Sequence, residues 1–145
     1  MITVKIRKIV PHAKLPKQMT RNAAGYDLFS ANETPVVIRP REIALIPTGI
    51  AVSIPDGYEG QIRPRSGLAA KEGIGVLNSP GTIDSDYRGE IKVILFNAGD
   101  KEFRLDKETR IAQMVISRCY ETEFILCREL DETERGEGGF GHTEK

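Results

Sequence analysis

Cysteine, histidine and long apolar runs are all scarce in this sequence. It holds 2 cysteines and 2 histidines. Cys119 and Cys127 do not form a CxxC pair, and neither His12 nor His142 lies at a ligand spacing from them. We therefore expect reduced thiols in a cytosolic protein and no zinc site built from protein ligands. No apolar run reaches the roughly 18 residues of a membrane span, and basic residues interrupt the N-terminal MITVKIRKIVPH. We expect no membrane helix, no signal peptide and a cytoplasmic location.

An excess of charge of either sign is also lacking. The chain has 21 lysines and arginines and 21 aspartates and glutamates. Proteins that bind a nucleic-acid polymer usually carry a basic excess, and wholly disordered chains carry a high net charge, so we expect neither class. The balance is uneven, because residues 1–128 hold 19 basic and 15 acidic side chains whereas residues 129–145 hold 2 and 6. An acidic tail therefore follows a mildly basic body.

Short runs of β-branched residues alternate with turn signals along most of the chain. The apolar runs that we expect to form strands are residues 2–6, 36–38, 43–54 with a break at 47–49, 91–95, 111–116 and 124–126. Residues 66–73 differ, because Ser66 as N-cap, a run of helix formers and a final Gly73 predict one two-turn helix. The whole pattern predicts an all-β sandwich or barrel with one short helix.

The composition changes near Asp131. Residues 131–145 hold four glycines, many charges and one aromatic side chain. A segment of this composition cannot form a hydrophobic core. We expect one domain over residues 1–130 and a flexible tail over residues 131–145, long enough to reach roughly 50 Å when extended. The tail contains a formal GxGxxG, but a dinucleotide fold needs that motif between a strand and a helix, so this interpretation is rejected. A tail that orders on an anionic ligand and a tail that stays solvated both remain open.

Four segments of the body carry polar side chains suited to binding or catalysis. The run 63–67, RPRSG, sets two arginines before a helix N-terminus, which suits a phosphate; a simple capped turn is the alternative. Residues 78–90 predict a hairpin in which Asp84, at a strand end, can act as a general base; a surface hairpin is the alternative. Asp27 follows a tight turn, and Arg110 and Gln113 lie on opposite faces of a regular strand. For these three residues, turn formation and edge solvation are the alternatives.

The combination of these segments is far more specific than any one of them. In chain order, AGYDL, RPRSGLA, GTIDSDYRGE, RIAQ and RGEGGFG closely resemble the five motifs of the homotrimeric dUTP pyrophosphatase (dUTPase) family. The resemblance spans residues 24–143. It implies a distorted jelly-roll of the dUTPase-like β-clip type and a homotrimer with shared active sites. It also implies Mg²⁺-dependent hydrolysis of dUTP to dUMP and pyrophosphate.

The resemblance also implies roles for individual residues. Asp84 would be the general base for the water that attacks the α-phosphorus, and Asp27 would contact Mg²⁺ through water. The substrate-binding residues that it implies are Arg65, Ser66, Gly67 and Gln113 for the phosphates, Asn78, Gly81, Thr82 and Ile83 for uracil, Tyr87 for deoxyribose, Lys92 for the nucleotide, and Arg135, Phe140, Gly141 and Thr143 in a tail that closes over the active site. Tyr87 would clash with a 2′-hydroxyl, and the hairpin backbone would exclude a C5 methyl group.

The last motif departs from the family pattern, which usually continues as FGSTG. His142 replaces a small hydroxyl residue and Glu144 replaces a glycine, so we expect weaker closure of the tail. The alternatives are a dCTP deaminase or bifunctional deaminase/dUTPase of the same fold, and a non-catalytic nucleotide-binding jelly-roll. The DSDY run that ends in Tyr87 favours the pyrophosphatase over the deaminase, and the retained Asp84 argues against a non-catalytic module.

Overall fold

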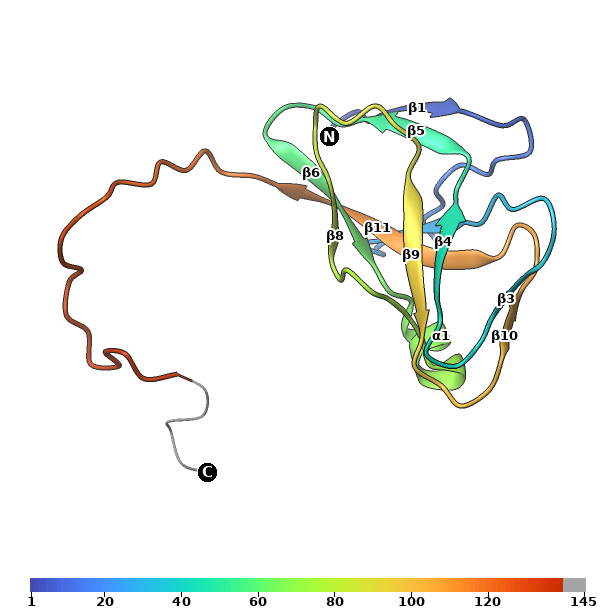
Figure 1. Ribbon diagram of the computed structural model, residues 1–145. Coiled ribbons are helices and arrows are strands. Elements are labelled where there is room, and N and C mark those ends of the chain that lie inside the picture. Colours follow the sequence, from blue (N-terminus) through green and yellow to red (C-terminus); the bar gives the residue numbers. More distant parts are fainter. Residues whose placement is uncertain (140–145) are drawn as a thin grey trace.

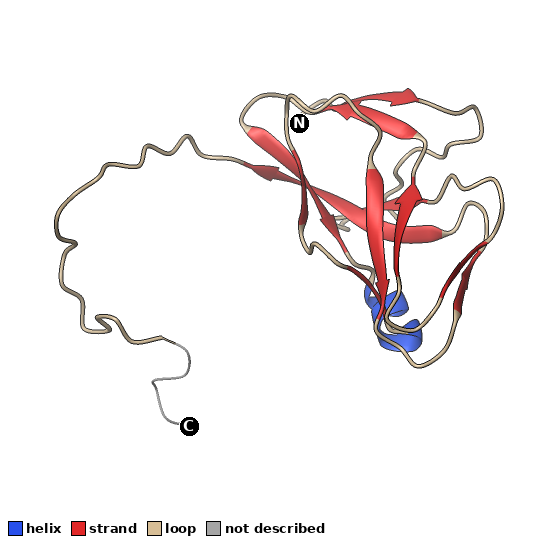
Figure 2. Ribbon diagram, viewed as in Figure 1, coloured by secondary structure: helices blue, strands red, loops and turns tan. Residues whose placement is uncertain are grey.

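The computed structural model describes residues 1–139, which form a body of short strands with one helix (Figures 1 and 2). The elements are β1 (Lys5–Lys8), β2 (Tyr26–Phe29), β3 (Val36–Ile38), β4 (Ile43–Pro47), β5 (Ile50–Ser53), β6 (Tyr58–Arg63), α1 (Ser66–Glu72), β7 (Ile74–Val76), β8 (Gly81–Ile83), β9 (Lys92–Asn97), β10 (Phe103–Leu105) and β11 (Arg110–Arg118). The strand pairs are antiparallel. The prediction of an all-β fold with one short helix is confirmed.

Four sheets make up the body. The largest has the order β2-β11-β6-β8, a second has the order β4-β9-β7, and two-stranded sheets pair β1 with β5 and β3 with β10. In Figure 1, α1 lies at one end of the body, beside the ends of β4 and β9. β8 lies at the edge of the largest sheet, because β6 is its one partner strand among the described residues. This open edge becomes important for the candidate site.

The core is built from aliphatic side chains that alternate along the strands. In β9, Val93, Leu95 and Asn97 are buried while Ile94 and Phe96 are more exposed, as a strand with one inward face requires. The largest fully buried hydrophobic side chains are Leu28, Ile38, Ile46, Ile50, Ile74, Ile91, Leu95, Leu105, Ile111 and Val93. Within residues 1–139 the buried hydrophobic core has no aromatic member. β-Branched side chains therefore supply both the strand preference and most of the buried apolar surface.

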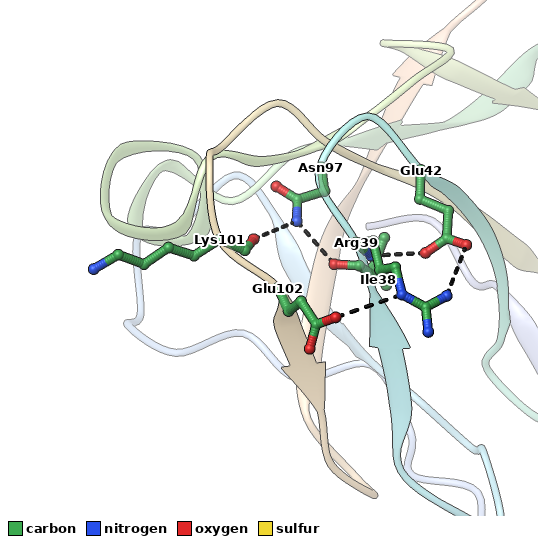
Figure 3. Close-up of polar contacts among 6 residues, drawn as sticks. All are labelled: Ile38, Arg39, Glu42, Asn97, Lys101 and Glu102. Atoms are coloured by element: carbon green, nitrogen blue, oxygen red, sulfur yellow. Dashed lines mark hydrogen bonds and ion pairs between the residues drawn. The ribbon is translucent and has the colours of Figure 1, made fainter.

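A buried asparagine joins the loops at the α1 end of the body (Figure 3). Asn97 is fully buried, and its Nδ2 donates to the carbonyl oxygens of Ile38 and Lys101, each at 2.8 Å. Its Oδ1 accepts a hydrogen bond from the Gly99 N–H at 2.9 Å. Nearby, Arg39 Nε lies 3.4 Å from Glu102 Oε1 at the surface. The satisfied amide thus fixes the end of β3 to the turn between β9 and β10.

Two local predictions differ from the structure. The N-cap of α1 is Arg65, whose backbone is extended (φ −94°, ψ 126°), and no side chain caps the helix. Ser66 is therefore the first helical residue, whereas Gly73 ends the helix in the left-handed conformation as predicted (φ 67°). Residues 78–90 do not form a hairpin, because β8 pairs with β6 whereas β9 pairs with β4 and β7. The loop between β8 and β9 crosses from one sheet to another.

The chain after β11 leaves the body. Residues 119–139 form no strand, and in Figure 1 they run away from the sheets. The strand expected at residues 124–126 is absent, and Phe124, Ile125 and Leu126 are 93%, 77% and 99% exposed. A β-prone run needs a partner strand, and residues 1–139 supply none there. Among residues 1–139 no helix has the length and apolar character needed to cross a membrane.

Candidate active site

A hollow of about 480 Å³ lies between the edge strand β8 and strand β9. We call it the β8 hollow. Its lining residues are Ile62, Val76, Asn78, Gly81, Thr82, Ile83, Asp84, Tyr87, Glu90, Lys92, Val93 and Ile94. Seven of these are residues that the sequence singled out: Asn78, Gly81, Thr82, Ile83, Asp84, Tyr87 and Lys92. The structure therefore brings the predicted uracil, sugar and general-base residues to one place.

The end of β8 presents a carboxylate to the solvent. β8 stops at Ile83, and the exposed Asp84 follows directly. The Asp84 carbonyl accepts the Tyr87 N–H at 3.2 Å, which closes a turn. None of the seven ion pairs found in residues 1–139 involves Asp84. Its carboxylate has no competing cation in the described part of the chain, as a proton acceptor requires.

Tyr87 folds over the next turn of the same loop. Its hydroxyl donates to the Glu90 carbonyl at 3.1 Å. A Cβ atom at Gly89 would overlap the Tyr87 hydroxyl and ring, so this approach requires glycine. The ring is thereby held at the rim of the β8 hollow, with its side chain partly exposed.

The backbone of β8 is free to recognise a planar ligand. One side of the strand bonds to β6, and its other side faces no strand in the described chain. Such an edge offers N–H and C=O groups that can pair with an amide-like ligand edge. Asn78 lies against Gly81, where an added Cβ would come within 3.0 Å of the Asn78 Nδ2. Backbone and side-chain amides therefore converge on one wall of the β8 hollow.

Glu90 lines the β8 hollow, and no role was predicted for it from the sequence. Its Oε1 accepts the Gly49 N–H at 2.9 Å, and its Oε2 lies 3.8 Å from Lys92 Nζ. Gly49 has φ +67°, and an added Cβ there would strike Val10 and Ala13. A glutamate beside a predicted turn does not indicate that its side chain binds the distant Gly49 N–H.

A second polar group lies at the other edge of the largest sheet. We call it the arginine cluster; its members are Asp27, Arg65, Arg110 and Gln113. Asp27 Oδ1 lies 3.4 Å from Arg65 Nε, and Asp27 Oδ2 accepts a hydrogen bond from Arg110 Nη1 at 3.1 Å. Arg65 Nη1 donates to the Arg110 carbonyl at 3.1 Å, and Gln113 Nε2 donates to the Pro64 carbonyl at 2.9 Å. The cluster brings together predicted phosphate and metal residues, and Ser66 and Gly67 follow Arg65 at the start of α1.

The expectation that Arg110 and Gln113 face opposite sides is wrong. The pairing of β11 with β2 shifts between Arg110 and Ala112, so one extra residue occupies β11. Arg110 pairs with Phe29 and Gln113 with Asp27, which lie two residues apart on β2 and so share a face. The bulge therefore turns both side chains to the same face of the sheet.

The two groups are far apart within one chain. Three strand spacings separate β2 from β8 across the largest sheet. Asp27 lies level with Arg63 of β6, whereas Asp84 follows Ile83, which pairs with Gly60. At strand spacings of about 4.8 Å and a rise of about 3.4 Å per residue, Asp27 and Asp84 are roughly 20 Å apart. One chain therefore does not bring all of the predicted residues to one place.

The described part of the tail, which includes Arg135, lies apart from both groups. Arg135 Nε donates to the Gly138 carbonyl at 2.8 Å, within the tail itself, and Figure 1 shows this part of the chain away from the body. Phe140, Gly141 and Thr143, and the departures at His142 and Glu144, lie outside the described residues.

Within residues 1–139 no group of three or more histidine, cysteine, aspartate or glutamate side chains is suited to hold a metal ion. Both carboxylate oxygens of Asp27 already contact guanidinium groups. Each oxygen can still accept a further hydrogen bond, so Asp27 fits a contact with metal-bound water better than direct ligation.

Comparison with known proteins decides the family. The family model described as dUTPase matches residues 11–144. The chain belongs to the dUTPase family. It is 61% identical over 132 residues to the deoxyuridine 5'-triphosphate nucleotidohydrolase of Rickettsia canadensis (strain McKiel), covering 89% of this chain and 87% of the relative. It is 53% identical to the Helicobacter pylori (strain J99) enzyme of the same name, covering 97% and 95%.

Solved dUTPase structures share the fold. That of Staphylococcus bacteriophage 80alpha with dUPNHPP superimposes with a TM-score of 0.88 at 31% identity, covering 97% of this chain and 98% of the other. A mutant dUTPase of phage phi11 of S. aureus, whose structure describes the coordination of a structural Mg(II) ion, gives 0.80 at 26% identity, covering 90% and 99%. The jelly-roll prediction is confirmed by these dUTPases, and the deaminase alternative is not favoured.

Proposed function

We propose that this dUTPase-family chain hydrolyses dUTP to dUMP and pyrophosphate in the cytoplasm. The observation that carries the proposal is the β8 hollow, where Asp84 follows the end of an edge strand and, among residues 1–139, has no ion pair. Asp84 acts as the general base, because an exposed carboxylate can orient a water molecule and take its proton. In-line attack on the α-phosphorus then depends mainly on positioning and charge neutralisation.

The base and sugar are recognised in the same hollow. The free edge of β8 at Gly81, Thr82 and Ile83, with the Asn78 amide, pairs with the polar edge of uracil. Backbone that close to the ring leaves no room for a C5 methyl group, which excludes thymine. The Tyr87 ring, held over Gly89, packs under the deoxyribose and excludes a 2′-hydroxyl. Lys92 contributes a positive charge beside the nucleotide.

The arginine cluster receives the triphosphate. Arg65, with the backbone and hydroxyl of Ser66 and Gly67, binds phosphate oxygens, and Gln113 supports the turn through the Pro64 carbonyl. Mg²⁺ would supply neutralisation of charge on the phosphate oxygens. Asp27 is the residue that would hold the ion, through its water shell.

The homotrimer joins the two groups into one site. A separation of roughly 20 Å within one chain is too long for one nucleotide to bridge productively, so a neighbouring subunit supplies the second group. Apolar side chains that are more than half exposed support such an assembly: Ile43, Leu45, Leu77, Phe124, Ile125 and Leu126. The tail closes over a neighbouring subunit's site, with Arg135 on the γ-phosphate, Phe140 on uracil, and Gly141 and Thr143 over the phosphates. Light scattering at micromolar concentration tests the trimer, and a monomer mass would contradict it.

A substrate panel tests the activity. The purified protein is given dUTP, dCTP, dTTP and UTP with Mg²⁺, and pyrophosphate and ammonia are measured separately. We expect pyrophosphate from dUTP with kcat/KM at least about 100-fold above the other three. Cytosine does not match the hydrogen bonds made to uracil, which penalises dCTP, whereas the C5 methyl group of dTTP and the 2′-hydroxyl of UTP clash with the β8 backbone and with Tyr87. Ammonia release from dCTP would indicate the deaminase. Binding of dUTP without turnover would indicate a non-catalytic module.

A further inference from the structure

Arg110 is a member of the arginine cluster to which the substrate-binding roles above assign nothing. Its Nη1 donates to Asp27 Oδ2 at 3.1 Å, and its carbonyl accepts from Arg65 Nη1 at 3.1 Å. Arg110 thus touches both of the residues to which the proposed function gives the metal water shell and the phosphates. The β11 bulge turns its side chain to the face of Asp27.

The cluster has one carboxylate for two guanidinium groups. Asp27 is largely buried, with 13% of its side chain exposed, whereas 22% of the Arg65 side chain and 40% of the Arg110 side chain are exposed. A carboxylate held out of solvent must keep a cationic partner. Arg110 is one partner and Arg65 is the other, so both arginines pair with the single negative charge of Asp27.

The sharing leaves Arg65 only partly engaged. Its Nε lies at 3.4 Å from Asp27 Oδ1, a looser contact than the 3.1 Å between Arg110 Nη1 and Asp27 Oδ2. Its Nη2 donates no hydrogen bond to any group in residues 1–139. Without Arg110, Asp27 would have Arg65 as its one cation. The carboxylate would then draw the Arg65 guanidinium into a tighter, bidentate pair.

We infer that Arg110 is a positioning residue that neutralises Asp27 and thereby keeps Arg65 available to the substrate phosphates. This inference rests on the proposed function, because Arg65 is taken as a phosphate ligand. Arg110 acts through the competition between Asp27 and the substrate for one guanidinium group. A net charge of +1 on the three side chains attracts a polyanion, whereas loss of Arg110 leaves Asp27 and Arg65 neutral as a pair.

The test measures binding of the dUTP analogue dUPNHPP by calorimetry, with EDTA present so that any contact of Asp27 with metal-bound water has no effect. In Arg110→Met the analogue should bind roughly tenfold more weakly than in the wild type, about the effect of one charge-assisted hydrogen bond. Removing the competing carboxylate as well, in Asp27→Asn with Arg110→Met, should restore the Kd to within about threefold of wild type. A structural role for Arg110 would not be rescued in this way.

Two further variants control the result. Arg104→Met removes an exposed arginine that contacts Asp106 at 3.1 Å and belongs to neither group, and it should leave the Kd unchanged. Arg110→Lys keeps the charge and should bind the analogue more tightly than Arg110→Met. Thermal unfolding of each variant shows whether it is folded, so a loss of binding is read only from folded protein.

The outcomes separate the inference from the proposed function. If the wild type neither binds dUPNHPP nor hydrolyses dUTP, the proposed function fails. If the wild type binds and Arg110→Met binds equally well, the inference about Arg110 fails while the function stands. A double variant no better than Arg110→Met would also overturn the inference, because Asp27 would then not be the competitor.

Discussion

The β8 hollow and the arginine cluster each hold one central aspartate, in opposite surroundings. Asp84 is exposed at the end of an edge strand and has no ion pair in residues 1–139. Asp27 lies within β2, is largely buried and contacts two arginines. The first carboxylate is free to accept a proton, whereas the second is occupied with balancing charge. We therefore expect the two aspartates to differ in what their removal costs, which is activity for Asp84 and stability for Asp27.

The largest expected effect comes from removing the free carboxylate. Asp84→Asn should lower kcat for dUTP roughly 10³-fold, because the general base is lost while the shape of the residue is kept. The thermal midpoint should stay close to that of the wild type, since an exposed side chain without partners contributes little to stability. Pyrophosphate release and thermal unfolding are the two measurements. Full activity of this variant would show that Asp84 is not the base.

Mixing two inactive variants tests whether the two groups come from different subunits. Asp84→Asn damages the hollow, and Arg65→Ala damages the cluster. If each site combines the hollow of one subunit with the cluster of the next, trimers refolded from an equal mixture should regain roughly a quarter of the wild-type activity, because a random quarter of sites receives two intact groups.

The same mixture also shows the opposite outcome clearly. If both groups served a site within one subunit, every chain in the mixture would carry a defect and activity would not recover. Each variant refolded alone under the same conditions is the control, and the mass of the mixed sample must remain that of a trimer.

In stability, unlike in activity, removal of Asp27 should have a larger effect than removal of Asp84. Asp27→Ala leaves the partly buried Arg65 and Arg110 without their carboxylate, and should lower the free energy of unfolding by about 2 kcal/mol. This expected loss is smaller than the loss for a fully buried ion pair, because both arginines are partly exposed. Asp84→Ala should change the free energy by less than about 0.5 kcal/mol.

Urea unfolding at one fixed protein concentration measures both variants, since assembly contributes to apparent stability. Equal losses in Asp27→Ala and Asp84→Ala would remove the distinction drawn between the two carboxylates.

The part of the candidate site that could be grouped from the sequence is the part whose residues are close in the chain. The residues of the β8 hollow that the sequence identified lie between positions 78 and 92, so a motif contains most of the geometry. The sequence also indicated the all-β class, because β-branched runs and turns are local signals. The N-cap of α1 was displaced by one residue, because the extended backbone of Arg65 could not be read from its neighbours.

Contacts between residues far apart in the chain could not be predicted from the sequence. Asp27 and Arg110 are 83 residues apart, and their contact depends on a bulge in β11 that no residue type marks. The contact of Glu90 with the Gly49 N–H spans 41 residues and was missed for the same reason. The apolar run 124–126 was expected to be a strand, but strand formation depends on a partner strand, and the described part of the chain provides none for it.

The smallest expected effect concerns an exposed ion pair that lies in neither group. Glu108 pairs with Lys14, and the hydrogen bond and positive charge of Lys14 hold the pKa of the Glu108 carboxyl below its usual value. A carboxyl with a lowered pKa in the folded state adds stability above its unfolded-state pKa, and this contribution is lost as the pH falls through the folded-state pKa. Glu108→Gln should therefore lower the thermal midpoint slightly at pH 7, and the difference from wild type should vanish in acid.

Asp106→Asn, which removes an exposed pair with Arg104, controls for the loss of a surface charge. A difference that persisted unchanged to low pH would point instead to the backbone of Glu108, whose φ of 55° is left-handed.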